Sequence, residues 1–236
     1  MSKKKFDVYL EFNYTHLNIC VLDLLDNHII YKKNQFYKSY IDSKELNFDE
    51  LYKLVEDNIF EVEKSTNEFI KDIYLMIETP LSKNINLSVM KKNEDNKIFT
   101  SDVMYLIQDA KQQILSTNLN LEIIHIVIDN YILDNVIYKY LPLDINCKNF
   151  SLDLQFICFP KNLIKDFEEL FLKQQILINR FICSNYVRKF NFENRDLDIC
   201  QKGREIEKGI NKQEVVSVPK IIKKTGFFER LFHFFS

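Results

Sequence analysis

Short runs of hydrophobic residues separated by polar turns dominate the first part of this chain. The runs predict three strands, at residues 6–12, 17–24 and 28–37, which pair most simply as an antiparallel meander. Apolar side chains at three- and four-residue spacing, with acids and lysines between them, then predict an amphipathic helix over residues 47–66. A further strand is predicted at 72–78, and Pro80 ends it.

The middle of the chain continues this alternation. Strands are predicted at five places, 85–91, 121–128, 131–138, 150–159 and 176–183. The second and third of these meet at Asp129 and Asn130, a pair that favours a tight turn even without glycine.

Two helices separate these strands. One begins at Thr100 or Ser101, either of which can cap it, and it has Asp102 in its first turn. Its predicted buried face consists of Val103, Leu106, Ile107, Ala110 and Ile114. Pro160 opens the other helix. Together the elements predict a mixed α/β (α+β) fold.

The pattern changes near residue 190. The residues that follow are of mixed charge, include Gly203, Gly209 and Pro219, and show no sustained apolar period. We therefore expect a flexible linker over 191–222. A short helix can form within it, but too few positions are apolar to predict firm docking.

Residues 223–236 predict an amphipathic helix that lies in a membrane surface. Its apolar residues fall on one arc of a helical wheel: Phe227, Phe228, Leu231, Phe232, Phe234 and Phe235. The basic residues Lys220, Lys223 and Lys224 adjoin this arc, a combination typical of helices that bind anionic lipid. The alternative is a terminal helix docked on the protein itself.

Composition limits the classes of function. With 236 residues, 46% of them hydrophobic, the chain can bury a substantial core as one bilobed domain or two small ones. The net charge is −2 with both signs interspersed, which predicts no nucleic-acid partner. No apolar run reaches the roughly 18 residues of a membrane span. The five cysteines are scattered, so we expect reduced, mostly buried thiols and no metal site.

Glycine is almost missing from the chain. All three glycines, Gly203, Gly209 and Gly226, follow residue 202, although average usage is about 7%. Phosphate-binding loops need glycine because their backbone N–H groups approach the ligand closely, so neither a P-loop nor a Rossmann fingerprint can be written here. The histidine and carboxylate residues fix no acid–base geometry. We predict no enzyme activity, no catalytic residue and no cofactor.

The order of elements and several local strings resemble the bacterial cell-division protein FtsA, a member of the actin-like family. The best stretch runs from FTSDVMYLIQDAKQQI through EIIHIVIDNYILD. The residues that match the family in order are Thr100, Asp102, His125, Tyr131, Asp134 and Pro142. The terminal GFFERLFHFF is similar to the helix that holds the family on the inner membrane.

This resemblance implies part of an actin-like first lobe. A 1A-like subdomain would span 1–83 and 165–190, with a strand-helix-strand-strand 1C-like subdomain inserted at 84–164. The resemblance also implies that the 1C-like part contacts a divisome protein and neighbouring copies of the chain, and its candidate residues are Asp102, His125, Tyr131 and Asp134. The implied protein is a non-catalytic cell-division scaffold, peripheral on the cytoplasmic side of the membrane at the division site.

The sequence departs from the family where nucleotide would bind. The Asp-x-Gly-Ser/Thr phosphate loop corresponds here to residues 11–16, where Asn13 and Tyr14 add bulk and Glu11 is longer than the aspartate it replaces. The predicted linker also begins where the family's second lobe would start. We therefore expect loss of nucleotide binding, and of the usual FtsZ contact that the second lobe carries.

Two other interpretations stay open. One is an ATP-binding, polymerising protein of the FtsA type that anchors FtsZ. The other is an adaptor similar to the pilus-assembly protein PilM, which shares the fold and docks a short peptide from a membrane protein. The amphipathic tail would be unexpected in such an adaptor.

Overall fold

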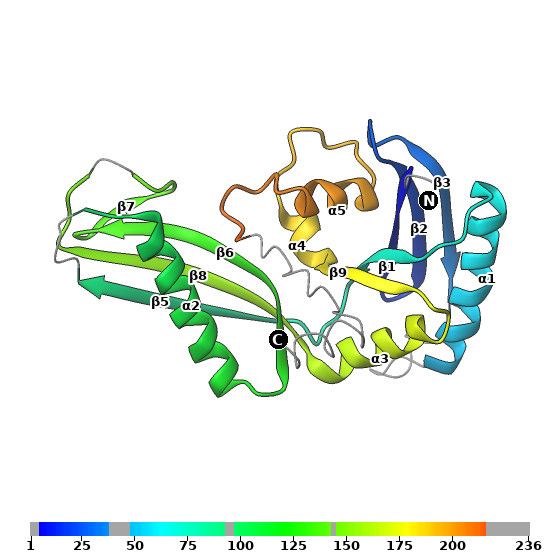
Figure 1. Ribbon diagram of the computed structural model, residues 1–236, viewed down its shortest axis with the longest axis horizontal. Helices are drawn as coiled ribbons and strands as arrows, with labels where there is room; N and C mark the ends of the chain where they lie inside the picture. The colour runs from blue at the N-terminus through cyan, green and yellow to red at the C-terminus, as the bar shows by residue number, and fades with distance from the viewer. Residues whose placement is uncertain (1–4, 38–47, 93–96, 143–144, 216–236) are drawn as a thin grey trace, which may run out of the picture.

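Two β-sheets lie one beside the other along the long axis of the molecule in the computed structural model (Figure 1). The structure describes residues 5–37, 48–92, 97–142 and 145–215. Within these ranges, five strands form the first sheet and four form the second. Among the described residues, no helix is long and apolar enough to cross a membrane.

The first sheet combines an antiparallel meander with parallel strands. β1 (Phe6–Phe12), β2 (His16–Asp23) and β3 (Ile29–Phe36) form the predicted meander. β4 (Asp72–Ile77) pairs parallel with β1, and β9 (Leu177–Cys183) pairs parallel with β4. The order is β3-β2-β1-β4-β9, and every residue of β1 is buried.

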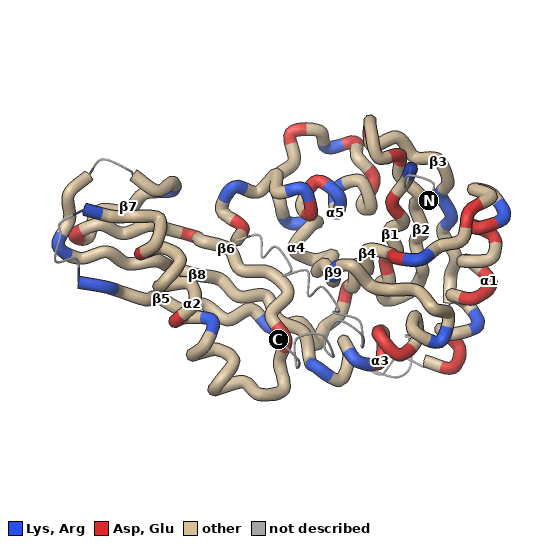
Figure 2. The backbone as a smooth tube through the Cα atoms, in the orientation of Figure 1, with Lys and Arg blue, Asp and Glu red and all other residues tan. Residues whose placement is uncertain are grey.

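Helices cover both faces of the first sheet. On one face, α1 (Phe48–Thr66) and α3 (Lys161–Leu172) share a core with β1, β2 and β4. On the other face, α4 (Ser184–Lys189) and α5 (Ile199–Glu207) pack around Tyr9, Cys20 and Met76. Acidic and basic residues are interspersed along α1, α3 and α5 (Figure 2). α3 packs with the first sheet. The part of the chain that forms the second sheet therefore ends with β8 at Pro160, before the boundary predicted at residue 164.

In the described part of the chain, one helix covers the second sheet. β5 (Lys83–Lys92), β8 (Asn149–Pro160), β6 (Leu121–Leu133) and β7 (Val136–Tyr138) lie in that order, all antiparallel. α2 (Thr100–Thr117) packs on one face through the five buried residues that the sequence predicted. The opposite face presents mainly polar side chains, and we call it the open face.

The turn predicted at Asp129 and Asn130 was wrong. β6 runs through both residues and ends at Leu133, and the turn to β7 is made by Asp134 and Asn135. Both of these residues have positive φ, 44° and 71°, a conformation that Asp and Asn tolerate better than other non-glycine residues. The Asp134 carboxylate also accepts hydrogen bonds from the backbone N–H groups of Lys148 and Asn149, which secures the turn.

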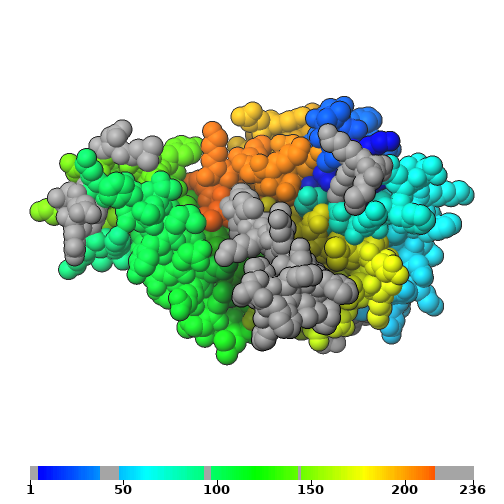
Figure 3. All heavy atoms as spheres, in the orientation of Figure 1, coloured from blue at the N-terminus to red at the C-terminus, as the bar shows by residue number. Residues whose placement is uncertain are grey.

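Residues 191–215 differ from the flexible linker predicted over 191–222, because they pack on the first sheet and then on the second. Cys200 and Ile206 of α5 are fully buried against β1 and β2. A Cβ at Gly203 would lie 2.6 Å from the Met76 sulfur, so glycine lets α5 approach the sheet closely. Figure 3 shows this segment, in orange, between the N-terminal strands and the second sheet.

The C-terminal predictions fall outside the described residues. They comprise the end of the predicted linker, 216–222, and the membrane-binding residues Lys220, Lys223, Lys224, Phe227, Phe228, Leu231, Phe232, Phe234 and Phe235. The membrane anchor stays a prediction.

Candidate functional site

A groove of about 340 Å³ lies where the open face of the second sheet meets α4. We call it the inter-sheet groove. Both sheets contribute to its lining, which consists of Ser82, Asn84, Gln155, Ile157, Cys183, Asn185, Tyr186, Lys189, Phe190 and Asn191. Segments far apart in the sequence therefore meet at this place.

Side-chain amides dominate the chemistry of the groove. Asn84, Gln155, Asn185 and Asn191 each offer a carbonyl acceptor and an NH₂ donor. A peptide backbone offers the same two groups in alternation, so such a lining can bind an extended chain through its main-chain atoms. Ile157 and Phe190 supply apolar surface, and Lys189 supplies a positive charge.

A buried polar network holds the two sheets together at the base of the groove. His125 of β6 donates from Nδ1 to Glu214 Oε1 at 2.7 Å, and its Nε2 accepts a hydrogen bond from the Cys183 backbone N–H at 3.0 Å. Arg180 and Tyr186 also donate to Glu214, at 2.6 and 3.0 Å. The network thus connects β6 with β9, with α4 and with the segment that follows α5.

The geometry of the network fixes the charge of His125. Because Nε2 accepts from a backbone N–H, the single ring proton lies on Nδ1 and the imidazole is neutral. Burial lowers the pKa of His125, which agrees with the neutral form. Burial alone would raise the pKa of Glu214, but the His125 hydrogen bond and the Arg180 charge hold it below its usual value. The pair is therefore a neutral histidine beside a carboxylate.

The segment carrying Glu214 also extends the second sheet. The Ile128 backbone N–H donates to Gln213 at 2.8 Å, and the Val215 N–H donates to Ile126 at 2.8 Å. This pairing uses the edge of β6 that β7 leaves free. The last described residues are thus bonded both to the edge of the second sheet and, through Glu214, to the first sheet.

The turn between β1 and β2 corresponds to the phosphate loop of the family that the sequence resembles. In this structure the turn is filled by the chain's own side chains. Glu11 is fully buried, accepts a hydrogen bond from Asn18 at 2.7 Å and forms an ion pair with Arg188. The Asn13 side chain accepts the backbone N–H groups of Thr15 and His16, at 3.0 and 2.9 Å. The N–H donors of Asn13, Thr15 and His16 are therefore already hydrogen-bonded within the turn.

The structure brings together one cluster that sequence spacing did not reveal. Cys20 of β2 and Asp198 and Cys200 at the start of α5 have their side-chain atoms within 4.8 Å of one another. Asp198 accepts from Lys32 at 2.7 Å and from the Cys200 N–H at 2.9 Å, so its carboxylate caps α5 and is paired with a cation. The hydrogen bond with Cys20, together with burial, raises the pKa of Cys200. All five cysteines are free and buried, as predicted.

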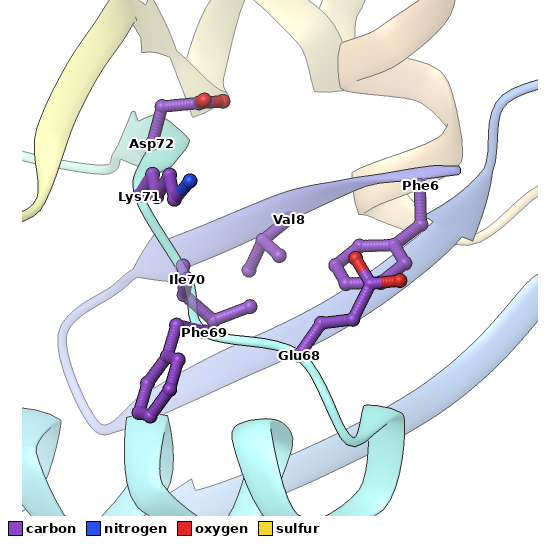
Figure 4. A pocket seen from close by; sticks show the side chains of 7 residues that line it. All are labelled: Phe6, Val8, Glu68, Phe69, Ile70, Lys71 and Asp72. Carbon is purple, nitrogen blue, oxygen red and sulfur yellow. The ribbon is translucent and has the colours of Figure 1, made fainter. Parts of the chain in front are cut away.

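A second pocket, of about 400 Å³, lies at the start of β1 and β4 (Figure 4). Val8 and Ile70 point toward each other across it, and Phe69 turns away. Its charged groups are Glu68, Lys71 and Asp72 on one short segment. Val8 and Ile70, which line this pocket, belong to the core of the first sheet. The polar groups of the pocket do not converge as those of the inter-sheet groove do.

The predicted partner-binding residues lie on the second sheet and its helix, with Asp102, Tyr131 and Asp134 toward one end of β6 and His125 toward the other. His125 and Tyr131 are 1% and 8% exposed, so both side chains are buried. Asp102 pairs with Lys91 and accepts the Phe99 N–H, which places Phe99, and not Thr100 or Ser101, at the cap of α2. Asp134 secures the β6–β7 turn. All four therefore have contacts within the fold, and partner binding through them stays a prediction.

The groove residues were missed by the sequence analysis, although a signal was present. Asn84, Asn86 and Ser88 alternate with apolar residues along one strand, and Ser151, Asp153 and Gln155 do so along another. Such alternation predicts one buried and one polar face, but it does not say which helix meets that face. Only the packing of α4 creates the groove.

No protein-family model and no curated protein sequence matches this chain. Solved structures do match its fold. A chain of the PilM–PilN type IV pilus biogenesis complex matches with a TM-score of 0.52 and 6% identity, over 77% of this chain and 48% of that one. This chain thus spans about half the length of that relative.

Two further structures match less well. One is the cytoplasmic domain of EpsL, an inner membrane component of the type II secretion system of Vibrio cholerae, with a TM-score of 0.37, 8% identity and coverage of 80% and 59%. The other is a Bacteroides thetaiotaomicron protein with an actin-like ATPase fold, with a TM-score of 0.33, 10% identity and coverage of 78% and 54%.

The fold is therefore mixed α/β, as predicted, and is similar to that of a chain of the PilM–PilN complex. The finer resemblance to FtsA stays a prediction. None of the three structures is described as a cell-division protein, so the predicted place in the divisome gains no support from them.

Proposed function

We propose that this protein is a non-catalytic assembly adaptor that binds an extended segment of a protein partner in the inter-sheet groove. The observation that carries the proposal is the groove itself, in which amide side chains from both sheets converge beside apolar surface. Of the interpretations left open by the sequence, the PilM-like adaptor fits best, since the matching fold belongs to a PilM–PilN complex. The FtsA-like cell-division scaffold ranks second, and the predicted amphipathic tail favours it.

The β1–β2 turn supports a role without nucleotide. Arg188 links the buried Glu11 to Glu78, which lies 3.0 Å from the guanidinium. A phosphate entering here would meet two carboxylates and backbone donors that the Asn13 side chain already occupies. Saturable binding of ATP by the full chain in equilibrium dialysis would contradict this part of the proposal.

The peptide-binding role is tested by panning a phage library of random dodecamer peptides on the full-length protein. We expect a consensus peptide to be enriched and to lose binding with Gln155→Trp, because the indole fills the groove. Gln112→Trp is the matched control, since Gln112 is exposed on the outer side of α2. A library that yields no consensus, or one whose peptides bind Gln155→Trp as well as wild type, contradicts the proposal.

The membrane anchor is proposed separately, from the sequence of residues 223–236. Burying its aromatic face would contribute on the order of several kcal/mol. We expect the full chain to sediment with vesicles containing anionic phospholipid and the double variant Phe228→Glu, Phe232→Glu to stay in the supernatant. Equal sedimentation of both proteins would show that the tail does not anchor the chain.

A further inference from the structure

The open face of the second sheet continues directly from the inter-sheet groove. Strand pairing places its side chains in rows across β5, β8 and β6. The row at the groove contains Asn84 together with the buried Ile157 and His125. The next row contains Asn86, Gln155 and the buried Val127. Along β5 and β8 each row lies two residues further, or about 7 Å, and a bulge between Ile128 and Asn130 adds one residue on β6. The same sheet therefore offers a series of side-chain positions with the period of an extended peptide.

The third row is acidic. Asp153 accepts hydrogen bonds from Ser88 at 2.6 Å and from Asn130 at 3.0 Å. Asp129 lines the same hollow, which has a volume of about 290 Å³. Lys139 reaches its rim, where it donates to the carbonyl oxygen of Asp129 and to the Asn130 side chain. Burial and the nearby Asp153 raise the pKa of Asp129 against the opposing charge of Lys139, so a further cation in the hollow would stabilise its ionised form.

The fourth row is apolar. It contains Met90, Ser151 and Ile132, and pairing with β7 adds Ile137. Met90 and Ile137 are both 62% exposed. Along the strands this row lies about 20 Å from the groove row and about 7 Å from the acidic row.

We propose that the open face extends the inter-sheet groove and selects a partner segment with a basic side chain over Asp129 and Asp153, followed by an apolar side chain over Met90, Ile132 and Ile137. The inference rests on the proposed function, because the segment must first occupy the groove. Two features favour an extended partner peptide as the occupant. The rows continue the groove at strand spacing, and the hollow carries two carboxylates against one lysine at its rim.

The predicted spacing follows from the rows. In the bound peptide, the residue over Asn84 and the residue over the acidic row are four positions apart. The residue over Asn84 and the residue over the apolar row are six positions apart. These spacings are the same for both directions of the peptide chain. The amide side chains of Asn86 and Gln155 lie between and can bond the peptide backbone.

The test uses a peptide enriched by the full-length protein and its Lys→Gln or Arg→Gln derivative, with affinities measured by fluorescence polarisation. We expect the enriched peptide to carry Lys or Arg two residues from an apolar residue. Asp129→Asn should weaken its binding about tenfold, as expected for loss of a charge-assisted hydrogen bond. The derivative should bind wild type and Asp129→Asn equally. The matched control is Glu56→Gln, which changes an exposed side chain of α1 and should alter neither affinity.

Three results would overturn the inference while leaving the proposed function standing. One is an enriched peptide that needs the groove but carries no basic residue or shows no coupling with Asp129. Another is self-association of the protein that Asp129→Asn abolishes with peptide affinity unchanged, since a second copy would then be the occupant. The third is tighter peptide binding by the variant with Lys220, Lys223 and Lys224 replaced by Gln, which would make the chain's own tail the occupant. If Gln155→Trp leaves peptide binding intact, the proposed function fails first, and the inference with it.

Discussion

The two sheets differ in how their faces are covered. Helices lie on both faces of the first sheet, and β1 at its centre is buried along its whole length. Of the described elements, α2 alone covers the second sheet, on one face, and the other face exposes Asn84, Asn86, Ser88 and Met90 of β5. An extended polar face has no role in burying a core, so this difference separates the part of the molecule that provides stability from the part available for binding.

The comparison also explains the segment after β9. Without α5, the face of the first sheet that holds Tyr9, Cys20 and Met76 would be exposed to water. Residues 191–215 cover it and then bond to the edge of the second sheet. The segment that sequence pattern assigned to a linker therefore completes one core and joins it to the other sheet.

The largest effect is expected where α5 covers the first sheet. Ile206→Ala should lower the free energy of unfolding by about 2–5 kcal/mol, because it removes a fully buried side chain. Ile210→Ala is the matched control, since Ile210 is 39% exposed just beyond the helix, and it should cost much less. Urea denaturation measures both. Equal, small changes would mean that this segment is a linker after all.

The sequence predicted the elements better than their packing. Strand and helix positions followed from local periodicity, as in β1, whose predicted range was confirmed. The docking of α5 was missed because its apolar contact surface is small and is supplemented by polar contacts: buried Arg204 donates to the carbonyl of Asp23, and Asp198 caps the helix. These bonds connect residues far apart in sequence, and hydrophobic patterning does not report them.

The candidate site was even less predictable. His125 was recognised as a strand histidine within a family motif, but its partner Glu214 lies in the segment expected to be a linker. The turn at Asp134 was misplaced because Asp129 and Asn130 offer the same local chemistry. What decided between the two pairs was the continued pairing of β6 with β8, a contact between distant segments.

The second largest effect is expected at the joint between the sheets. Glu214→Ala should destabilise the protein by about 1–3 kcal/mol, because His125, Arg180 and Tyr186 would lose their common acceptor. Glu214→Gln keeps an acceptor oxygen and should cost less. Urea denaturation compares the two, and hydrogen exchange at the Cys183 amide reports local opening. If Glu214→Ala matched wild type in both measurements, the joint would not hold the sheets together.

The pH dependence of stability should sharpen the role of the same joint. The pKa of His125 in the folded protein lies below its ordinary value of 6.5, chiefly because of burial, so the unfolded chain takes up the proton first as pH falls. The contribution of His125 to the free energy of unfolding should therefore be fully present above pH 6.5 and decline as the pH falls below that value. Glu214, whose pKa is also lowered, adds a further loss below its ordinary value of 4.5.

His125→Gln tests this assignment, because glutamine can replace both hydrogen bonds but does not titrate. The variant should show a shallower fall in unfolding free energy between pH 6.5 and 5 than wild type, and the same change at exposed His28 serves as the matched control. Parallel pH profiles for wild type and His125→Gln would assign the acid sensitivity to other groups.

The smallest effect on stability is expected on the open face, where adjacent residues of β8 provide the comparison. Leu154 is 1% exposed and faces α2, so Leu154→Ala should cost about 2–5 kcal/mol. Gln155 points to the opposite face and lines the groove, so Gln155→Ala should change stability by no more than about 0.5 kcal/mol while weakening peptide binding. Urea denaturation and fluorescence polarisation separate the two effects. A large loss of stability in Gln155→Ala would show that the amide supports the fold, and the division between a buried face and a binding face would no longer hold for the second sheet.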